Sequence, residues 1–491
     1  MRIPTELYRP SLALLTDLYQ LTMAHAAWRA GVAEQEAVFH LFFRKNPFGG
    51  GFALACGLDP ALDLLGGLRF DEDDLGYLGS LTGSDGKPLF APEFLDYLRD
   101  TPLALDVDAL PEGTAVFPQE PLMRVRGPIV ACMLAETPLL NLVNFQTLTA
   151  TKAARIHLAA GGEPVLEFGL RRAQGIDGAL AASRAAYVGG CAATSNVLAG
   201  RLFGIPVRGT HAHSWVMLFD DEREAFDAYA RAMPNNCVFL VDTYDSLEGV
   251  RRAVEVGRWL REHGHQLHGI RLDSGDLAQL SVEARRILDE GGFPEARVYA
   301  SNDLDEEVIA SLKSQGAAIA VWGVGTRLVT AHGDPALGGV YKLAAVRRPG
   351  EQWRYRIKVS EQAIKTSTPG ILQVRRFELG GRCVADGIFD EQQGWCPGPE
   401  RVVVDPLEPT RRTRIPAEAE ARDLLVPALR AGRRVLAPEP LAETRRRAQT
   451  ELAALPVGVK RFLNPHLYPV GLEPGLHELK TRMILEARRP A

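Results

Sequence analysis

The sequence predicts an α/β protein whose central part is a closed or nearly closed barrel of parallel strands. Between residues 160 and 345, short apolar segments alternate with helix-like segments at intervals of about 20–40 residues, as in βαβ units. Six such segments follow one another, which favours a barrel over an open sheet. Polar or charged residues follow each apolar segment, whereas the segments themselves are apolar.

The residues before this region predict an N-terminal α+β domain. Residues 10–28 carry apolar side chains at helical spacing. Residues 37–58 have the pattern of an apolar strand, a Gly-rich turn and a second apolar stretch. Residues 60–100 are acidic and predict short helices, and the prolines of residues 101–130 indicate small antiparallel strands. A helix from residue 133 is expected to carry the chain into the middle domain.

The middle and C-terminal regions differ in their patterns. The predicted strands of the middle region are 163–168, 205–210, 237–243, 268–273, 297–302 and 318–324, with helices at 178–203, 247–264 and 277–292. After residue 345 the alternation stops. Residues 351–405 look strand-rich, and residues 415–455, rich in Arg, Glu and Ala, look helical. We therefore expect an N-terminal domain over residues 1–158, a catalytic domain over 159–345 and an accessory domain over 346–491.

Composition limits the possible functions. The chain has 491 residues, 46% of them hydrophobic and 24% charged, as in a globular protein of more than one domain. A net charge of −5 gives no reason to expect a nucleic acid or a membrane as partner.

The cysteines and the apolar runs bear on location. The cysteines are Cys56, Cys132, Cys191, Cys237, Cys383 and Cys396. They have neither disulfide-framework nor zinc spacing, which fits a reduced compartment. The first residues are too polar for a signal peptide, and no run reaches the roughly 18 uncharged apolar residues of a membrane span. We expect a cytoplasmic protein.

Functional groups in a parallel barrel come from the carboxyl ends of the strands. The polar residues at these positions are Glu167, Arg171, Arg172, Thr210, His211, His213, Ser214, Asp242, Thr243, Asp245, Arg271, Asp273, Ser274, Asp276, Ser301, Asn302, Asp303, Thr326 and Arg327. Helix capping is an alternative explanation for any single one, Asp242 for example. It does not explain six strand ends with polar residues, so we expect an active site here.

The residue types narrow the chemistry. The short glycine pattern at residues 323–326 can cradle a phosphate with backbone N–H groups, although such a pattern alone is a weak signal. The two carboxylates of residues 272–276 suit Mg²⁺ or a pair of ribose hydroxyls. Arginine side chains bind anions through a fork of N–H donors. Together, these residue types indicate a substrate with several negative charges and sugar hydroxyls. His213 stands beside hydroxyls as a general base, a nucleophile or a helix cap, and its residue type does not choose among them.

Eight motifs resemble those of the nicotinate phosphoribosyltransferase family, in the same order and at similar spacing. They are TDLYQLTM (16–23), FRKNPF (43–48), EFGLRRAQG (167–175), RGTHAHSW (208–215), VDTYD (241–245), GIRLDSGDL (269–277), SNDLDE (301–306) and GVGT (323–326). The resemblance covers about residues 10–345, and the remaining part is similar to the family's third domain with weaker motifs.

The resemblance implies a fold and a reaction. The fold is that of type II phosphoribosyltransferases, with an irregular (β/α) barrel and an N-terminal domain that completes the site of a neighbouring subunit in a homodimer. The reaction joins nicotinate to phosphoribosyl pyrophosphate, giving nicotinate mononucleotide and pyrophosphate in NAD salvage. It is a ligase-type transfer coupled to ATP hydrolysis, with Mg²⁺ as cofactor.

The resemblance also implies roles for residues of the nicotinate pocket. Tyr19 offers an aromatic face across the dimer interface, although it could instead pack a helix onto the core. Arg271 clamps the nicotinate carboxylate or shares its charge with the phosphoribosyl group. Thr210 donates a hydrogen bond on the nicotinate side.

The remaining roles concern the phosphates. The residues implied to bind phosphoribosyl pyrophosphate are Arg171, Thr326, Gly325, Ser274, Gly275, Arg44 and Lys45. Of these, Arg44 and Lys45 would act from the partner subunit, unless they are solvated in an exposed turn. Asp273 would bind ribose hydroxyls or Mg²⁺. His213 would become a phosphohistidine, with His211 as the alternative acceptor, and the expected catalytic residues are His213, Arg271 and Asp273.

Two rival functions remain. Nicotinamide-using relatives have an acid at the position of His211, within a G-T-D-T stretch, whereas this sequence reads RGTHAHSW. The second rival is an inactive binding paralogue. The presence of all the residues with implied roles argues against it.

Overall fold

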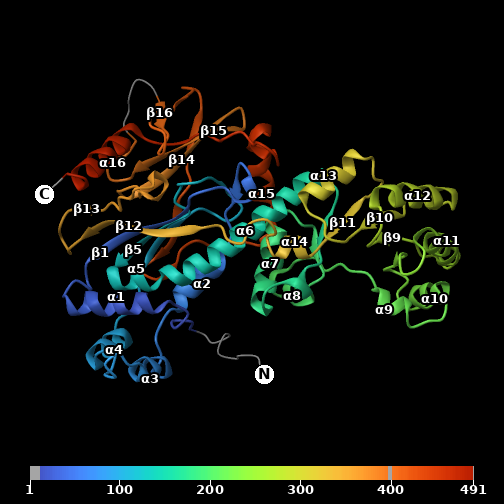
Figure 1. Cartoon of the computed structure of the whole chain (residues 1–491), viewed down its shortest axis with the longest axis horizontal. Helices are drawn as coiled ribbons and strands as arrows, with labels where there is room; N and C mark the ends of the chain where they lie inside the picture. The colour runs from blue at the N-terminus through green and yellow to red at the C-terminus, as the bar shows by residue number, and fades with distance from the viewer. Residues whose placement is uncertain (1–10, 396–400, 490–491) are drawn as a thin grey trace. The chain divides into compact units, whose positions relative to one another are not determined.

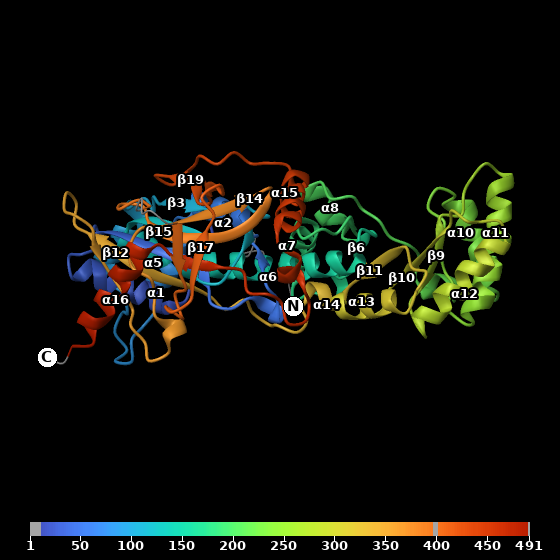
Figure 2. The same cartoon turned by 90° about the horizontal axis from the view of Figure 1, so that it is seen from above.

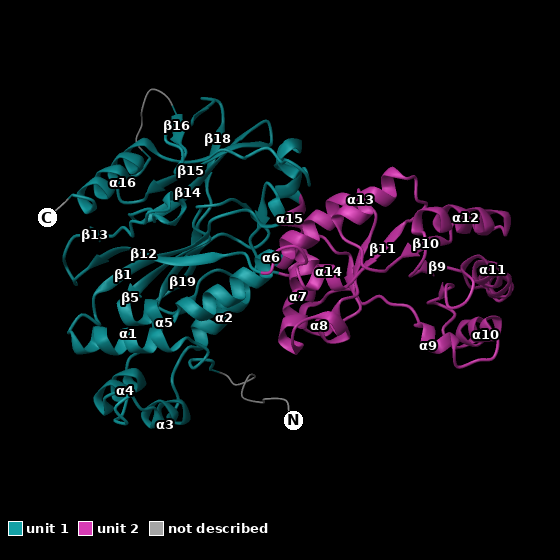
Figure 3. Cartoon of the chain, in the orientation of Figure 1, with its two compact units in different colours: residues 1–148, 336–439, 450–491 teal, residues 149–335, 440–449 magenta. Residues whose placement is uncertain are grey.

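The computed structural model describes residues 11–395 and 401–489. The chain forms two compact units (Figure 3), which we call unit 1 (residues 1–148, 336–439 and 450–491) and unit 2 (residues 149–335 and 440–449). Figure 1 labels their elements in chain order.

Unit 2 is built on a six-stranded sheet of parallel strands in the order β7-β6-β11-β10-β9-β8. The strands are β6 (Val165–Glu167), β7 (Ala193–Thr194), β8 (Val238–Leu240), β9 (Gly269–Leu272), β10 (Arg297–Ala300) and β11 (Val321–Val324). Figure 2 shows β6, β11, β10 and β9 following one another across the unit. Parallel strands place all their carboxyl ends at one edge, so the polar residues that follow them meet there.

The two edge strands of this sheet are linked by the segment around Val207. Val207 forms a parallel bridge with Thr194 at the end of β7. A few residues later the imidazole of His211 accepts a hydrogen bond from the backbone N–H of Leu240, at the end of β8. One loop thus contacts both edge strands, and the parallel sheet with its helices confirms the predicted α/β class.

Helices surround this sheet in unit 2. They are α7 (Ile176–Val188), α8 (Val197–Phe203), α9 (His213–Val216), α10 (Glu222–Ala232), α11 (Ser246–Glu262), α12 (Leu277–Glu290), α13 (Glu306–Ser314) and α14 (Thr326–Val329). The helix α11 shows why these residues fold this way. The Asp245 side chain accepts from the N–H of Glu248 and caps the helix, whose buried face includes Val250, Val254 and Leu260.

Unit 1 contains a seven-stranded sheet in the order β13-β12-β1-β5-β3-β19-β20. Its strands are β1 (Glu36–Phe43), β3 (Asp106–Ala109), β5 (Met123–Pro128), β12 (Gly339–Arg347), β13 (Arg354–Tyr355), β19 (Val426–Arg430) and β20 (Arg433–Arg434). The N-terminal β1 pairs with β12, and the N-terminal β3 pairs with β19. Distant parts of the sequence thus share one sheet, and seven of the eight residues of β1 are buried in it.

A second sheet of unit 1 has the order β17-β16-β21-β15-β14-β18, and β2 pairs with β4. These strands are β2 (Ala53–Leu54), β4 (Ala115–Val116), β14 (Leu372–Leu379), β15 (Arg382–Asp390), β16 (Arg401–Val404), β17 (Arg412–Ile415), β18 (Glu420–Asp423) and β21 (Val470–Leu472). The helices are α1 (Leu18–Arg29), α2 (Leu58–Gly67), α3 (Glu72–Ser80), α4 (Pro92–Asp100), α5 (Ile129–Leu134) and α16 (Pro474–Ala487). Two further helices, α6 (Glu136–Ala160) and α15 (Leu441–Ala454), contain residues of both units.

Three predictions about elements were wrong. The helix expected over 178–203 is two helices separated by β7. It ends at Gly189 and Gly190, and Gly190 has a φ of +122° and lies so close to His157 that a Cβ would be 2.7 Å from Cγ of the ring. The strand expected over 205–210 is a single bridge, because Pro206 has no N–H and the loop turns toward His211.

The third wrong prediction concerns the stretch expected to be helical from residue 415 to 455. Residues 420–434 instead form β18, β19 and β20, and only α15 is helical. Each residue of β18 is exposed. An exposed edge strand lacks the apolar alternation by which strands are recognised, so its charged sequence looked helical.

The predictions about the cysteines, a membrane and the domain division concern the whole chain. The described cysteines are free and buried, and Cys396 lies outside the described residues. One described helical stretch, Ile129–Ala160, is long and apolar enough to cross a membrane by length and composition, and 56% of its most apolar window is buried within the fold. Core helices of soluble proteins have the same composition. The expected absence of a membrane partner and the three-part division at residues 158 and 345 stay predictions.

Candidate active site

The carboxyl edge of the unit 2 sheet brings several predicted residues together. Arg271, in β9, donates a hydrogen bond from Nη1 to the Thr210 hydroxyl at 2.5 Å. Burial lowers the pKa of Arg271, while the carboxylates of Asp273 and Asp242 act to raise it. Its buried Nε has no hydrogen-bond partner among the described residues. Arg271 therefore keeps a donor available for an anionic ligand.

Two carboxylates lie beside this arginine. Asp242 Oδ2 accepts hydrogen bonds from the backbone N–H of Asp273 at 2.8 Å and from the Ser274 hydroxyl at 2.7 Å. Asp273 accepts a hydrogen bond from the Ser301 hydroxyl, which comes from the end of β10. Asp242 Oδ1 is buried and has no partner among the described residues. Three neighbouring strand ends are thus linked around two carboxylates.

Asp242 was expected at the active-site edge but was given no specific role, because helix capping explained it equally well. In the structure it caps no helix, since Asp245 is the cap of α11. The spacing of Asp245 and Glu248 is that of an N-cap and its third helical residue, which is a signal that could have identified the cap. The residue left over, Asp242, then belongs to the site.

The two histidines of the RGTHAHSW motif have different environments. His213, the first residue of α9, lies 3.2 Å through Nδ1 from the Thr243 hydroxyl and 3.8 Å through Nε2 from Asp273 Oδ2. Its side chain is 39% exposed. His211 is buried among Phe226, Tyr229 and Phe239.

Burial, above all, lowers the pKa of His211 to about 4, so this ring is neutral at physiological pH. Of the two histidines, His213 is the one that is open to a ligand, because the side chain of His211 is buried.

The remaining strand ends carry anion-binding features. Arg171 is exposed in a 3₁₀ turn after β6, and its charge lowers the pKa of Arg271, which places the two cations in each other's field. Gly325 precedes α14 and approaches β6 closely, because a Cβ there would lie 3.2 Å from the carbonyl oxygen of Phe168. Asn302 and Asp303 have positive φ values of 98° and 40°, a strained conformation that is common at functional sites.

Some polar strand-end residues have structural roles. The Glu167 carboxylate is fully buried and accepts hydrogen bonds from the hydroxyls of Ser183 and Thr194. Asp276 and Asp305 cap α12 and α13, and Arg327 forms an ion pair with Asp305 at 2.6 Å. These groups hold the loops in place.

Three predicted site residues lie in unit 1 instead. Tyr19, in α1, is 47% exposed and its hydroxyl lies 3.3 Å from Glu136 Oε1. It does not pack α1 onto the core. Arg44 and Lys45 lie in the loop after β1. Their roles at the site rest on the sequence resemblance alone.

A magnesium ion fits these residues only together with substrate phosphates. The described residues contain no group of three or more His, Cys, Asp or Glu side chains arranged to hold a metal. Mg²⁺ in phosphate-handling enzymes is commonly bound by one or two carboxylates plus substrate oxygens. Asp242 and Asp273 provide such a pair.

The fold and the site define a class. A parallel α/β sheet with arginines, carboxylates, hydroxyls and glycines at its carboxyl edge is typical of enzymes that bind phosphorylated ligands. Family models match at residues 14–144, for the nicotinate phosphoribosyltransferase N-terminal domain, and at residues 373–480, for the C-terminal domain. The chain is 42% identical to nicotinate phosphoribosyltransferase of Bacillus subtilis, over 96% of this chain and 97% of that protein.

Human nicotinate phosphoribosyltransferase is 38% identical, over 95% of each chain. A crystal structure of human nicotinic acid phosphoribosyltransferase superimposes with a TM-score of 0.82 at 35% identity, covering 95% of this chain and 99% of that one. This chain belongs to the nicotinate phosphoribosyltransferase family.

Proposed function

We propose that the chain transfers the phosphoribosyl group of phosphoribosyl pyrophosphate to nicotinate, and couples the transfer to ATP hydrolysis through a phosphohistidine. The observation that carries the proposal is the linked set of Thr210, Arg271 and Asp273 beside His213 at one barrel edge, in a chain of this family. The products are nicotinate mononucleotide and pyrophosphate, in the salvage of NAD. The pyridine nitrogen attacks C1 of the ribose, and the bond from C1 to the pyrophosphate oxygen breaks.

In this proposal, catalysis comes from the positioning of the substrates and from electrostatic stabilisation of the transition state. The pyridine nitrogen is already a nucleophile, and positive charge develops on the ribose ring as pyrophosphate leaves. Arg271, with Thr210, binds the nicotinate carboxylate or an oxygen of the donor. Asp273 and Asp242 face the ribose hydroxyls, and Mg²⁺ bound with the diphosphate would neutralise its charge.

The donor phosphates are assigned to cations and backbone donors. The residues proposed to bind them are Arg171, Ser274, Gly275, Gly325 and Thr326, with Arg44 and Lys45 of the partner subunit in a homodimer. The first N–H groups of α14 follow Gly325 and have no acceptors within the helix. Arg171, Arg44 and Lys45 have no ion pair among the described residues, and their positive charges suit a diphosphate.

His213 is the proposed phosphoryl acceptor. With its proton on Nδ1, facing Thr243, the imidazole presents the Nε2 lone pair, which attacks the γ-phosphorus of ATP and releases ADP. Water later takes the phosphoryl group and frees phosphate. The added negative charge beside Asp273 links phosphorylation to donor binding. The burial of His211 supports His213 over His211.

The test measures nicotinate mononucleotide formed from nicotinate and phosphoribosyl pyrophosphate, with and without ATP. We expect product in both, and a lower KM for the donor with ATP. Nicotinamide in place of nicotinate is the matched comparison. Faster turnover with the amide would favour the nicotinamide-using alternative, and binding of the donor without product would favour the inactive paralogue. The proposed location is cytoplasmic, which the free, buried cysteines support.

A further inference from the structure

Unit 1 contains a cavity of about 1120 Å³, which we call the cationic cavity. Its walls come from the loop after β1, the turn at Phe117–Gln119, and residues of the segments 403–413 and 461–470. Cavities of this size hold small-molecule ligands such as cofactors and nucleotides. The C-terminal part of the chain supplies much of the wall.

The charges of the cationic cavity are unbalanced. Arg44, Lys45 and Arg461 line it, and no ion pair joins any of them to a carboxylate of the described residues. The carboxylates on the wall are already paired, because Arg411 lies 3.5 Å from Asp405 and 2.6 Å from Glu408. Three positive charges thus remain for an anionic ligand.

Unsatisfied polar atoms point to the same conclusion. Gln119 lines the cavity, is only 7% exposed, and has no hydrogen-bond acceptor for Nε2 among the described residues. Arg44 Nε is likewise buried without a partner. A buried donor without an acceptor destabilises the folded protein, and a bound anion would supply the missing acceptor.

The backbone of the wall is also strained. Gln119 has a φ of 72° and Asn464 a φ of 46°, in the left-handed region that non-glycine residues avoid. Strained backbone conformations cluster at ligand sites.

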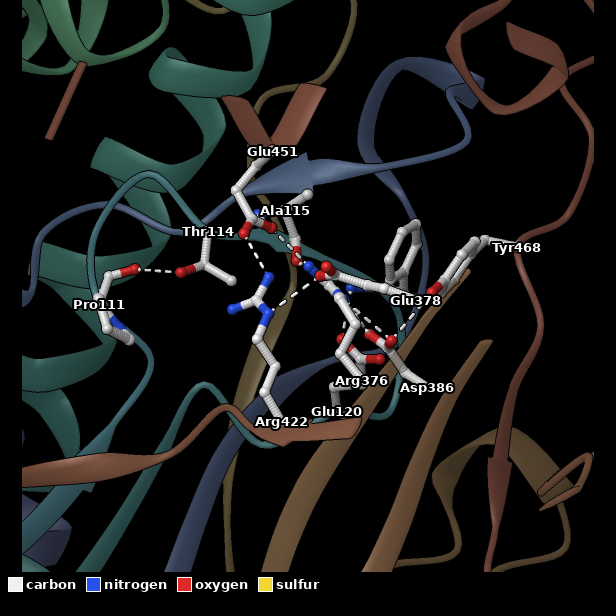
Figure 4. A network of polar contacts seen from close by, with 11 residues as sticks. Pro111, Thr114, Ala115, Glu120, Arg376, Glu378, Asp386, Arg422, Glu451 and Tyr468 are labelled. Carbon is white, nitrogen blue, oxygen red and sulfur yellow. Dashed lines mark hydrogen bonds and ion pairs between the residues drawn. The ribbon is translucent and has the colours of Figure 1, made fainter. Parts of the chain in front are cut away.

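Tyr468, a wall residue of the cationic cavity, belongs to a buried network of polar contacts (Figure 4). The rings of Phe117 and Tyr468 stack with centroids 4.0 Å apart, and Tyr468 donates a hydrogen bond to Asp386 at 2.9 Å. Asp386 and the fully buried Arg376 form an ion pair at 2.5 Å. A site whose supporting side chains are already fixed loses little entropy on binding.

Glu120, the residue that follows Gln119, belongs to the same network. Burial, and next the charge of Asp386, raise the pKa of Glu120 well above its usual range.

We infer that the cationic cavity binds the diphosphate or polyphosphate group of a ligand, and that Arg461 and Gln119 are binding residues together with Arg44 and Lys45. The inference rests on the proposed function, which supplies three ligands with such a group: phosphoribosyl pyrophosphate, pyrophosphate and ATP. Arg461 and Gln119 then give the C-terminal part of the chain and the β4–β5 turn a role in ligand binding.

The test is calorimetric titration of the full chain with pyrophosphate, phosphoribosyl pyrophosphate and a non-hydrolysable ATP analogue. Arg461→Ala is expected to weaken the binding of at least one ligand tenfold or more, and Arg461 is exposed, so the fold does not depend on it. The separate variant Gln119→Glu should also weaken the binding of the same ligand, because it adds a carboxylate to the cavity. Arg482→Ala, which removes an exposed arginine of α16 outside the cavity, should leave each affinity unchanged.

The three ligands distinguish the source of the phosphate. Loss of pyrophosphate and donor binding alone assigns the cavity to the donor, whereas loss of the ATP analogue alone assigns it to ATP. Wild-type affinities in both Arg461→Ala and Gln119→Glu would overturn the inference. A wild-type protein that releases no pyrophosphate with nicotinate would contradict the proposed function instead, because calorimetry needs no turnover.

Discussion

We expect the proposed site to depend strongly on Arg271. It is largely buried and donates a hydrogen bond to Thr210, and the charges of Asp273, Asp242 and Arg171 all act on its pKa. A buried guanidinium with an unpartnered Nε is costly in the free protein, and an anionic ligand would stabilise it.

Arg271→Ala should therefore lower kcat/KM, because it leaves substrate charge without a partner. The expected loss of transition-state stabilisation is about 3–5 kcal/mol. Arg271→Lys should recover only part of this, since lysine lacks the fork. Steady-state kinetics with circular dichroism as a folding check would measure both. Near-normal turnover in a folded Arg271→Ala protein would contradict the assignment.

The two histidines allow a sharper comparison. We expect His213→Ala to lose ATP hydrolysis and base-stable label from γ-labelled ATP, while it still makes some nicotinate mononucleotide at high substrate concentration. His211→Ala should keep the label, because His211 is buried behind aromatic rings. Label that survives in His213→Ala and disappears in His211→Ala would move the role to His211. Label in both would reject a histidine on this loop.

The position of a single residue was predictable where the residue follows the carboxyl end of a parallel strand. Arg271, Asp273 and Ser274 follow one strand of a parallel set, so the edge on which they meet follows from the alternation of strands and helices. The bond from Thr210 to Arg271 could not be predicted, because it joins residues 61 positions apart across a loop that forms no strand. Nor could the burial of His211, which depends on three aromatic rings from other segments.

At the scale of elements, prediction worked for amphipathic helices and failed for short strands. The helix α11 shows its buried face at helical spacing and a cap at its start. In contrast, β7 has two residues and no pattern of its own, and it exists because it pairs with β6. Pairing partners far away in sequence decide such strands.

The helix α16 contains a buried lysine whose charge state should be measurable. Lys480 is 5% exposed, and its ammonium group lies 3.3 Å from the Thr368 hydroxyl. Burial lowers the pKa of Lys480 to about 8. Lysine in an unfolded chain titrates near pH 10.4.

Between about pH 8 and pH 10, the unfolded chain therefore holds a proton that the folded chain has lost. The contribution of Lys480 to folding stability should rise with pH in this window, by up to about 1.4 kcal/mol per pH unit. Lys480→Met should flatten the rise of Tm over this range and raise Tm at pH 7, where the buried charge is costly. Arg482→Met is the exposed control and should change neither. Identical pH profiles for Lys480→Met and wild type would refute the pKa assignment.

At the scale of the whole molecule, the proposed homodimer makes each site composite. Tyr19 belongs to unit 1 and Arg271 to unit 2, and the family resemblance assigns them to sites shared between subunits. The exposed ring of Tyr19 is free to serve a ligand or a neighbouring subunit.

Mixing inactive Tyr19→Ala and Arg271→Ala proteins under subunit exchange should restore part of the activity. In a mixed dimer, one site receives both wild-type residues, so about a quarter of the wild-type rate is expected if half of the dimers are mixed and the subunits exchange freely. The measurement is nicotinate mononucleotide formation, with exchange verified by mass-tagged subunits. No recovery after verified exchange would place Tyr19 outside a shared site.

The seven-stranded sheet of unit 1 has a consequence for the order of events on the ribosome. Its strands β1, β3 and β5 emerge early, but β19, which pairs with β3, emerges roughly 300 residues after β5. At about 5–20 residues per second, the nascent chain waits on the order of 15–60 s with the edge of β3 unpaired. Unpaired strand edges are templates for aggregation. Translation that stalls before residue 426 should therefore leave a chain that holds its first strands in a chaperone-dependent state.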